Sequence, residues 1–80
     1  MTFTDLRNKY EAENNKRGLE VLAKIDADET VRLLPNEEDD AILKDLQSLD
    51  WRLWLALKNR SYVNSKDHWV ICPTPAHYNI

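Results

Sequence analysis

The amino-acid sequence predicts a single α+β domain over residues 1–80, in which two helices, the second one long, pack on a small antiparallel sheet. Three observations favour this fold class: an acidic helix start followed by a long apolar stripe, short runs of strand-forming residues that end at prolines, and a length of 80 residues, which is enough for one domain only. An all-α three-helix bundle is the alternative, because residues 19–25 suit a helix as well as a strand.

The first helix is expected to begin near Phe3. Thr2 and Asp5 have the spacing of a capping box, in which each side chain accepts a hydrogen bond from the other residue's backbone N–H. Residues 16–18, two basic residues and a glycine, are typical of a helix end, because cations complement the terminal carbonyl groups and glycine tolerates the left-handed conformation. The first helix therefore ends before residue 19, unless it continues to Ile25.

Three short strands are expected to form the sheet. Residues 19–25 alternate in polarity, residues 30–34 are rich in strand formers, and residues 68–72 form a third apolar run. Residues 26–29 would be the polar turn of a hairpin between the first two strands. Residues 61–67 are predicted to be a polar loop. Prolines follow the third strand, so the last eight residues, 73–80, are expected to form an extended tail.

The second helix is expected over about residues 37–59. Asn36 is a favourable N-cap, and four acidic residues follow it in the first turn, where the helix dipole favours negative charge. Ser48 and Asp50 could cap a new helix, so a kink or a short turn at that point is an open alternative. Apolar residues recur at steps of four and three along this segment: Ile42, Leu46, Leu49, Leu53 and Ala56.

The predicted core draws on every one of these elements. Trp51, Trp54 and Leu55 lie beside the apolar stripe, so residues 51–57 are apolar nearly all round. Such a segment is either central to a core or divided between a core and an interface. The expected core residues are Leu6, Tyr10, Val21, Ile25, Val31, Leu33, Ile42, Leu46, Leu49, Leu53, Leu57, Trp69 and Ile71.

Charge is unevenly distributed along the chain, whose net charge is −3. Residues 1–20 are neutral, residues 21–50 carry nine acidic against three basic residues, and residues 51–80 are mildly basic. A solvated helix start explains residues 37–40 taken alone, but it does not explain the acidic residues outside that run. The acidic segment is therefore predicted to be an interaction surface.

The predicted function is to bind, and to inhibit or modulate, a larger protein with a basic surface, such as one that handles nucleic acid. Clustered carboxylates steer such an encounter, and large aromatic side chains supply contact area. In short length, acidity and lack of enzymatic motifs, the chain resembles the small stand-alone inhibitors made by phages and mobile elements, including anti-CRISPR proteins. The candidate partner-binding residues are Asp26, Asp28, Glu29, Glu37, Glu38, Asp39, Asp40, Asp45, Trp51 and Trp54.

Two other functions stay open. In the first, the chain is an obligate subunit or a homodimer that associates through residues 51–57. In the second, it binds nucleic acid, either through a helix-turn-helix over residues 41–60 or through a basic, aromatic surface near the end of the chain. The net charge of −3 argues against direct nucleic-acid contact. The residues of that basic, aromatic surface would be Arg60, Tyr62, Lys66 and Trp69.

No catalytic, cofactor or metal site is expected, and the chain is not predicted to be an enzyme. His68, Cys72 and His77 are the only soft or borderline metal ligands, they match no zinc-finger spacing, and a fourth ligand is missing. A single glycine excludes a glycine-rich phosphate-binding loop. One cysteine, no signal peptide and no apolar run long enough to span a membrane together predict a cytoplasmic protein.

Overall fold

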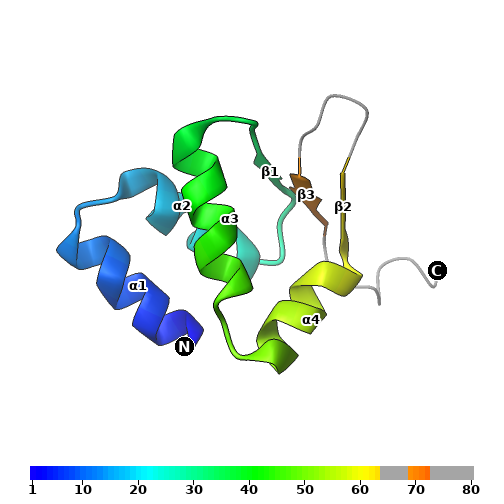
Figure 1. Cartoon of the computed structure of the whole chain (residues 1–80), viewed down its shortest axis with the longest axis horizontal. Coiled ribbons are helices and arrows are strands. Elements are labelled where there is room, and N and C mark those ends of the chain that lie inside the picture. Colours follow the sequence, from blue (N-terminus) through cyan, green and yellow to red (C-terminus); the bar gives the residue numbers. More distant parts are fainter. Residues whose placement is uncertain (64–68, 73–80) are drawn as a thin grey trace.

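The computed structural model describes residues 1–63 and 69–72, and within them it contains four helices and a three-stranded antiparallel sheet (Figure 1). The predicted α+β class is confirmed, and the three-helix bundle is wrong because the strands pair. The predicted tail, residues 73–80, lies outside the described residues. The elements are α1 Phe3–Ala12, α2 Lys16–Asp26, β1 Val31–Leu33, α3 Glu37–Gln47, α4 Trp51–Asn59, β2 Ser61–Val63 and β3 Trp69–Ile71.

Helix α1 begins as predicted, with a complete capping box. Thr2 Oγ1 accepts from the Asp5 backbone N–H at 3.2 Å, and Asp5 Oδ2 accepts from the Thr2 backbone N–H at 3.0 Å. The helix ends at Ala12, and Asn14 takes the left-handed conformation, with φ of 55°, that reverses the chain. Asparagine is one of the few residues other than glycine that adopts this conformation readily.

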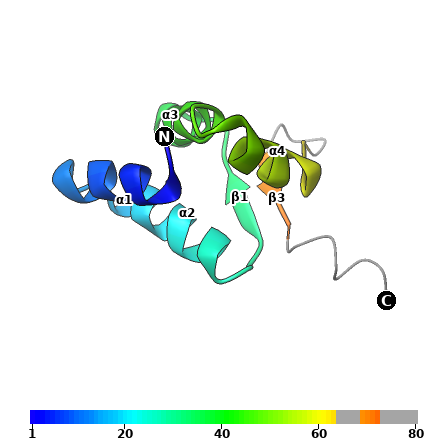
Figure 2. The same cartoon turned by 90° about the horizontal axis from the view of Figure 1, so that it is seen from below.

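The predicted strand at residues 19–25 is wrong, because these residues form the middle of α2, which packs against α1 (Figure 2). Val21, Leu22 and Ile25 are all buried, a spacing that matches one face of a helix. The turn predicted for residues 26–29 consequently joins α2 to β1 and not two strands of a hairpin.

Gly18 does not end a helix as predicted but lies in the first turn of α2. The side chain of Asn15 caps this helix, since its Oδ1 accepts from the Gly18 backbone N–H at 3.0 Å. A Cβ atom at position 18 would lie 2.6 Å from the nearest ring atom of Tyr10. The missing side chain therefore lets the buried Tyr10 ring of α1 approach the backbone of α2 closely.

The long helix predicted over residues 37–59 is two helices, α3 and α4, separated by the turn Ser48-Leu49-Asp50. Asn36 caps α3 as predicted, with Oδ1 accepting from the Asp39 backbone N–H at 2.8 Å. Leu49 is buried within the turn, so the apolar stripe continues while the chain changes direction. Two helices joined by three residues form a helix-turn-helix.

The sheet has the strand order β1-β3-β2, with both pairs antiparallel. Strands β1 and β3 confirm two of the predicted strands, and His68 lies outside the described residues. Strand β2 falls within the segment predicted to be loop; its side chains are largely exposed, and pairing with β3 is what makes it a strand. Strands β2 and β3 follow this helix-turn-helix, and β3 also pairs with the earlier strand β1.

The core lies between the helices and the inner face of the sheet. Of the 13 predicted core residues, all except Leu53 and Trp69 are buried, and these two are partly buried and pack against the core. Leu22 and Val70 are buried as well, although they were not predicted. No helix in the described part of the chain is both long and apolar enough to cross a membrane.

Candidate functional site

The outer face of α4, which we define as Trp51, Arg52, Leu55, Lys58 and Asn59, carries the two large apolar side chains that are exposed on helices in the described part of the chain. Trp51 is 69% exposed and Leu55 is 41% exposed. Residues four apart lie on the same side of a helix, so these two side chains are neighbours. The guanidinium of Arg52 lies 5.9 Å from the centroid of the Trp51 ring, within the range of a cation–π contact.

The opposite side of α4 is firmly attached to the domain. Leu57 is buried, and the rings of Trp54 and Trp69 stack with centroids 6.0 Å apart and planes inclined by 29°. Trp54, predicted to bind a partner, is therefore half-buried and connects α4 to β3. Trp51 and Leu55 project from the side of α4 that faces away from these packed side chains.

The outer face of α4 is positive, in contrast to the chain as a whole. Arg52 and Lys58 are exposed, and no acidic residue occurs in α4. Strand β2 follows directly and presents Tyr62 and Val63, each 53% exposed. This part of the molecule combines exposed apolar side chains with local positive charge.

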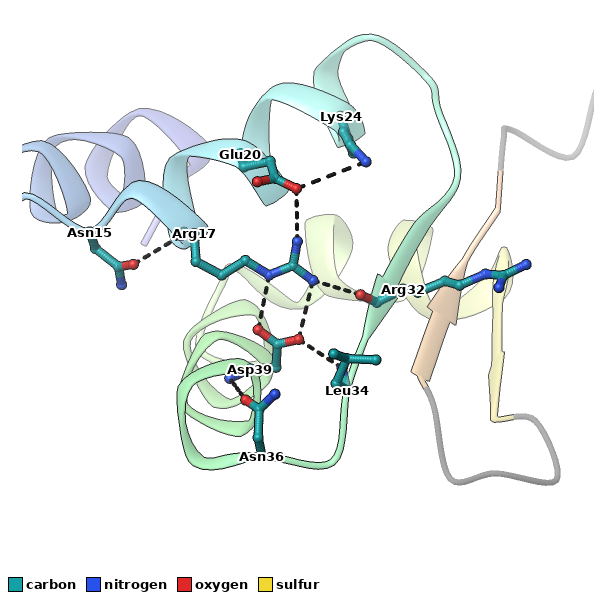
Figure 3. A network of polar contacts seen from close by, with 9 residues as sticks. Asn15, Arg17, Glu20, Lys24, Arg32, Leu34, Asn36 and Asp39 are labelled. Atoms are coloured by element: carbon teal, nitrogen blue, oxygen red, sulfur yellow. Dashed lines mark hydrogen bonds and ion pairs between the residues drawn. The ribbon is translucent and has the colours of Figure 1, made fainter.

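Asp39, one of the predicted partner-binding residues, is 2% exposed and cannot belong to a binding surface. Its carboxylate accepts two hydrogen bonds from Arg17, from Nε at 3.0 Å and from Nη2 at 3.1 Å, and one from the Leu34 backbone N–H at 2.7 Å (Figure 3). Burial raises the pKa of Asp39, but the hydrogen bonds from Arg17 and Leu34 outweigh it, so the pKa lies below its usual value. Asp39 is thus a structural carboxylate.

Asp45 and Asp28 also have internal partners. Asp45 accepts hydrogen bonds from Lys9 Nζ at 3.0 Å and from the Tyr10 hydroxyl at 2.9 Å, which ties α3 to α1. Burial, followed by this bond to Asp45, raises the pKa of Tyr10 far above its usual value. Asp28 accepts from Arg60 Nη1 at 3.0 Å. Both acids contribute to the fold, in a way that a charge count does not reveal.

The remaining acidic residues form two groups. Glu37, Glu38 and Asp40 are exposed at the start of α3, and Asp26 and Glu29 are exposed at the end of α2 and in the loop after it. Strand β1 separates the groups, one preceding it and the other following it (Figure 1). The predicted acidic segment is therefore not one continuous surface but two smaller ones at opposite ends of β1.

The residues predicted to form a basic, aromatic surface are only partly available. The Arg60 side chain is 11% exposed and paired with Asp28, Trp69 is half-buried against Trp54, and Tyr62 is exposed. Lys66 lies outside the described residues.

For a metal site, residues 1–63 and 69–72 contain no cluster of three histidine, cysteine or acidic side chains suited to hold an ion. Two of the three candidate ligands considered from the sequence, His68 and His77, lie outside this range. Cys72 is half-buried and has a free thiol.

Comparison with known proteins gives no identity for this chain. No family model matches the sequence, and neither a curated protein nor a solved structure matches it significantly.

Proposed function

We propose that this protein binds a larger protein through the outer face of α4 and thereby modulates it. The observation that carries the proposal is the exposed Trp51, with Leu55 one turn later and Arg52 against its ring. Tryptophan and arginine are enriched among the few residues that dominate the binding energy of protein interfaces. Trp51 and Leu55 lie side by side, and adjoining exposed apolar side chains, unlike single ones, mark interaction surfaces.

The partner that fits this face has an apolar pocket for Trp51, rimmed by carboxylates that complement Arg52 and Lys58. Charged groups at the rim of an interface contribute mainly to orientation and to the rate of association, whereas the desolvated aromatic anchor contributes most of the affinity. Because α4 is held by Leu57 and by the Trp54–Trp69 stack, little conformational entropy is lost when the face is covered.

The exposed acids at the start of α3 support a second contact, with a basic surface such as that of a protein that handles nucleic acid. Reversing Glu37, Glu38 and Asp40 to lysine should slow association strongly, and the slowing should disappear at high salt. The expected loss of folding stability is modest, about 0.3–1 kcal/mol per site from the helix dipole. Asp40→Lys also removes the exposed Asp40–Lys44 ion pair, which contributes less than about 1 kcal/mol. If the wild-type protein and the triple variant associate with the partner at equal rates at low salt, the outer face of α4 is the sole contact.

Site-specific photo-crosslinking in the native host tests the proposal. A photoreactive phenylalanine placed at position 51 or at position 55 should yield one discrete adduct with a larger protein. The same group at Asn8, an exposed residue of α1, is the matched control and should give no such adduct. Adducts that are equally diffuse at all three positions would contradict the proposal. An adduct of twice the mass of the chain would favour the homodimer instead.

Direct nucleic-acid binding is a second candidate, and the helix-turn-helix formed by α3 and α4 is the observation that favours it. In a helix-turn-helix the second helix enters the major groove, and α4 offers Arg52, Lys58 and Asn59 there. Trp51 and Leu55 on the same face are unsuited to base edges, and the net charge of −3 disfavours a polyanion. Fluorescence anisotropy with duplex DNA tests this candidate. A Kd below about 1 µM at physiological salt that rises in Lys58→Ala would favour nucleic-acid binding.

The proposal assigns the protein no catalytic step and no cofactor, and it places the protein in the cytoplasm. These assignments come from the sequence. Elemental analysis of the purified protein checks for a metal cofactor, and fractionation of the host checks the location. Stoichiometric metal in the purified protein would contradict the assignment of no cofactor.

A further inference from the structure

The two edge strands of the sheet, β1 and β2, differ in whether their outward backbone groups are bonded (Figure 1). On β1, the Arg32 carbonyl oxygen accepts from Arg17 at 2.7 Å, and the Leu34 N–H donates to Asp39 at 2.7 Å. These side chains close the β1 edge. On β2, no hydrogen bond from the described part of the chain reaches the outward backbone groups. An edge with unbonded N–H and C=O groups is a template for a further strand.

The register of β2 on β3 identifies the outward groups. The Cys72 N–H donates to the Arg60 carbonyl oxygen at 2.8 Å, so these two opposed residues form a hydrogen-bonded pair. Such pairs alternate with non-hydrogen-bonded pairs along an antiparallel ladder, and Ser61 and Val63 fall at non-hydrogen-bonded positions. The N–H and C=O groups of Ser61 and Val63 therefore point away from β3, whereas those of Tyr62 point toward it.

Strand β2 lacks most of the features that keep an edge strand from pairing. Natural edge strands commonly carry a charged residue or a proline. Residues 61–63 contain neither, and the charge of Arg60 just before them is neutralised by Asp28, 3.0 Å away. The Tyr62 and Val63 side chains are each 53% exposed and lie on opposite faces of the strand. Only the short length of β2, three residues, limits pairing.

We propose that β2 pairs antiparallel with β2 of a second copy of this chain, about a two-fold axis at Tyr62. In this register Ser61 of one copy lies opposite Val63 of the other, so every outward N–H and C=O group gains a partner. The two Tyr62 side chains become neighbours, and aromatic cross-strand pairs stabilise sheets. Because β2 is uncharged, an identical strand is not repelled, and such self-complementary two-fold contacts form the commonest dimers. The inference does not depend on the proposed partner of α4.

Sedimentation equilibrium of the purified protein measures this association. A reversible dimer with a Kd of roughly 10 µM to 1 mM is expected, because three residues per chain make a small interface. Val63→Pro should weaken it by about tenfold or more, since proline lacks the N–H that donates to the second copy. This N–H does not bond to β3, so the variant should fold, which circular dichroism verifies. Tyr62→Lys should weaken the dimer similarly, by placing like charges opposite each other. Trp51→Ala should leave it unchanged.

Disulfide trapping in a Cys72→Ser background tests the register. The Cα atoms of a non-hydrogen-bonded pair lie about 4.5 Å apart, within the range of about 4.4–6.8 Å that a disulfide spans. Tyr62→Cys should therefore give a disulfide-linked dimer. Val63→Cys, at a position of equal exposure, should not, because the two copies of this residue are not opposed.

Three results would overturn the inference. The first is a wild-type protein that stays monomeric up to about 1 mM. The second is a dimer that persists in both Val63→Pro and Tyr62→Lys, or that Trp51→Ala removes, since the contact would then lie elsewhere, as on the outer face of α4. The third is a disulfide that forms as readily in Val63→Cys as in Tyr62→Cys.

Discussion

Arg17 of α2 and Asp39 of α3 form a two-point ion pair, in which Nε donates to Oδ1 at 3.0 Å and Nη2 donates to Oδ2 at 3.1 Å. Nη2 also donates to the Arg32 carbonyl oxygen at 2.7 Å, and Nη1 donates to Glu20 Oε1 at 2.9 Å. Figure 3 shows one guanidinium that thereby joins α2, β1 and α3. The largest cluster of polar contacts that we describe thus belongs to the fold and not to a binding surface.

Replacing Arg17 by methionine should destabilise the protein severely, because Asp39 would be left buried without its charge partner. Losing one partner of a buried ion pair costs about 3–5 kcal/mol of unfolding free energy. Lys24→Met is the matched control, since the Lys24–Glu20 pair is exposed and 3.9 Å long and contributes less than about 1 kcal/mol. Urea denaturation measures both values, and similar losses in the two variants would contradict this role of Asp39.

The buried carboxylate of Asp39 should make the folding stability depend on pH. A carboxyl group whose pKa is lower in the folded than in the unfolded state stabilises the fold above its unfolded pKa, near 4, and loses this contribution as the pH falls through the folded value. Wild-type unfolding free energy should therefore fall below about pH 4. Asp39→Asn should be less stable at pH 7 and should lose less below pH 4. Parallel pH profiles for the two proteins, measured by urea denaturation, would show that Asp39 is not the responsible group.

Gly18→Ala should destabilise the protein even though alanine is the better helix former. A Cβ atom 2.6 Å from the buried Tyr10 ring would displace α1 from α2, and such overpacking costs about 1–3 kcal/mol. The gain in helix propensity, at most about 1 kcal/mol, does not offset it. A double-mutant cycle with Tyr10→Leu tests the cause, because the smaller side chain should make Gly18→Ala neutral or favourable. An equal loss in both backgrounds would show that the ring is not involved.

Leu46 and Leu53 occupy equivalent positions in the apolar stripe of the sequence, but they differ in burial in the structure. Leu46 is 0% exposed, whereas Leu53 is partly buried and lines a pocket beside α4. Leu46→Ala should cost about 2–5 kcal/mol, and Leu53→Ala should cost less, since its site is already partly open. Thermal and urea unfolding of the two variants provide the comparison, and a larger loss at Leu53 would show that the core is centred on α4.

Features that depend on neighbours in sequence were predicted well. The capping box of Thr2 and Asp5, the N-cap at Asn36 and strands β1 and β3 are all present. The features that were missed depend on distant contacts. Strand β2 exists through its pairing with β3, and α2 is distinguished from a strand by the packing of Gly18 on Tyr10 and by the bonds of Arg17.

The candidate site shows the same limit. Trp51 was among the predicted partner-binding residues and is exposed as such a role requires. Asp39 was included for its charge, but its partner Arg17 lies 22 positions earlier, a relationship that no local pattern contains. The sequence does not show which of Trp51 and Trp54 is exposed. The structure does, because Trp54 stacks on Trp69 whereas Trp51 is exposed.

The central claim, that α4 binds a protein through its outer face, is tested most directly by the dissociation constant for the partner captured at position 51. Trp51→Ala should raise this Kd by roughly 30-fold or more, which corresponds to the 2 kcal/mol that defines a dominant interface residue. The melting temperature should stay unchanged because the side chain is 69% exposed. Asn8→Ala, on α1, is the matched control and should leave the Kd unaffected. A Kd for Trp51→Ala within about twofold of the wild-type value would contradict the account.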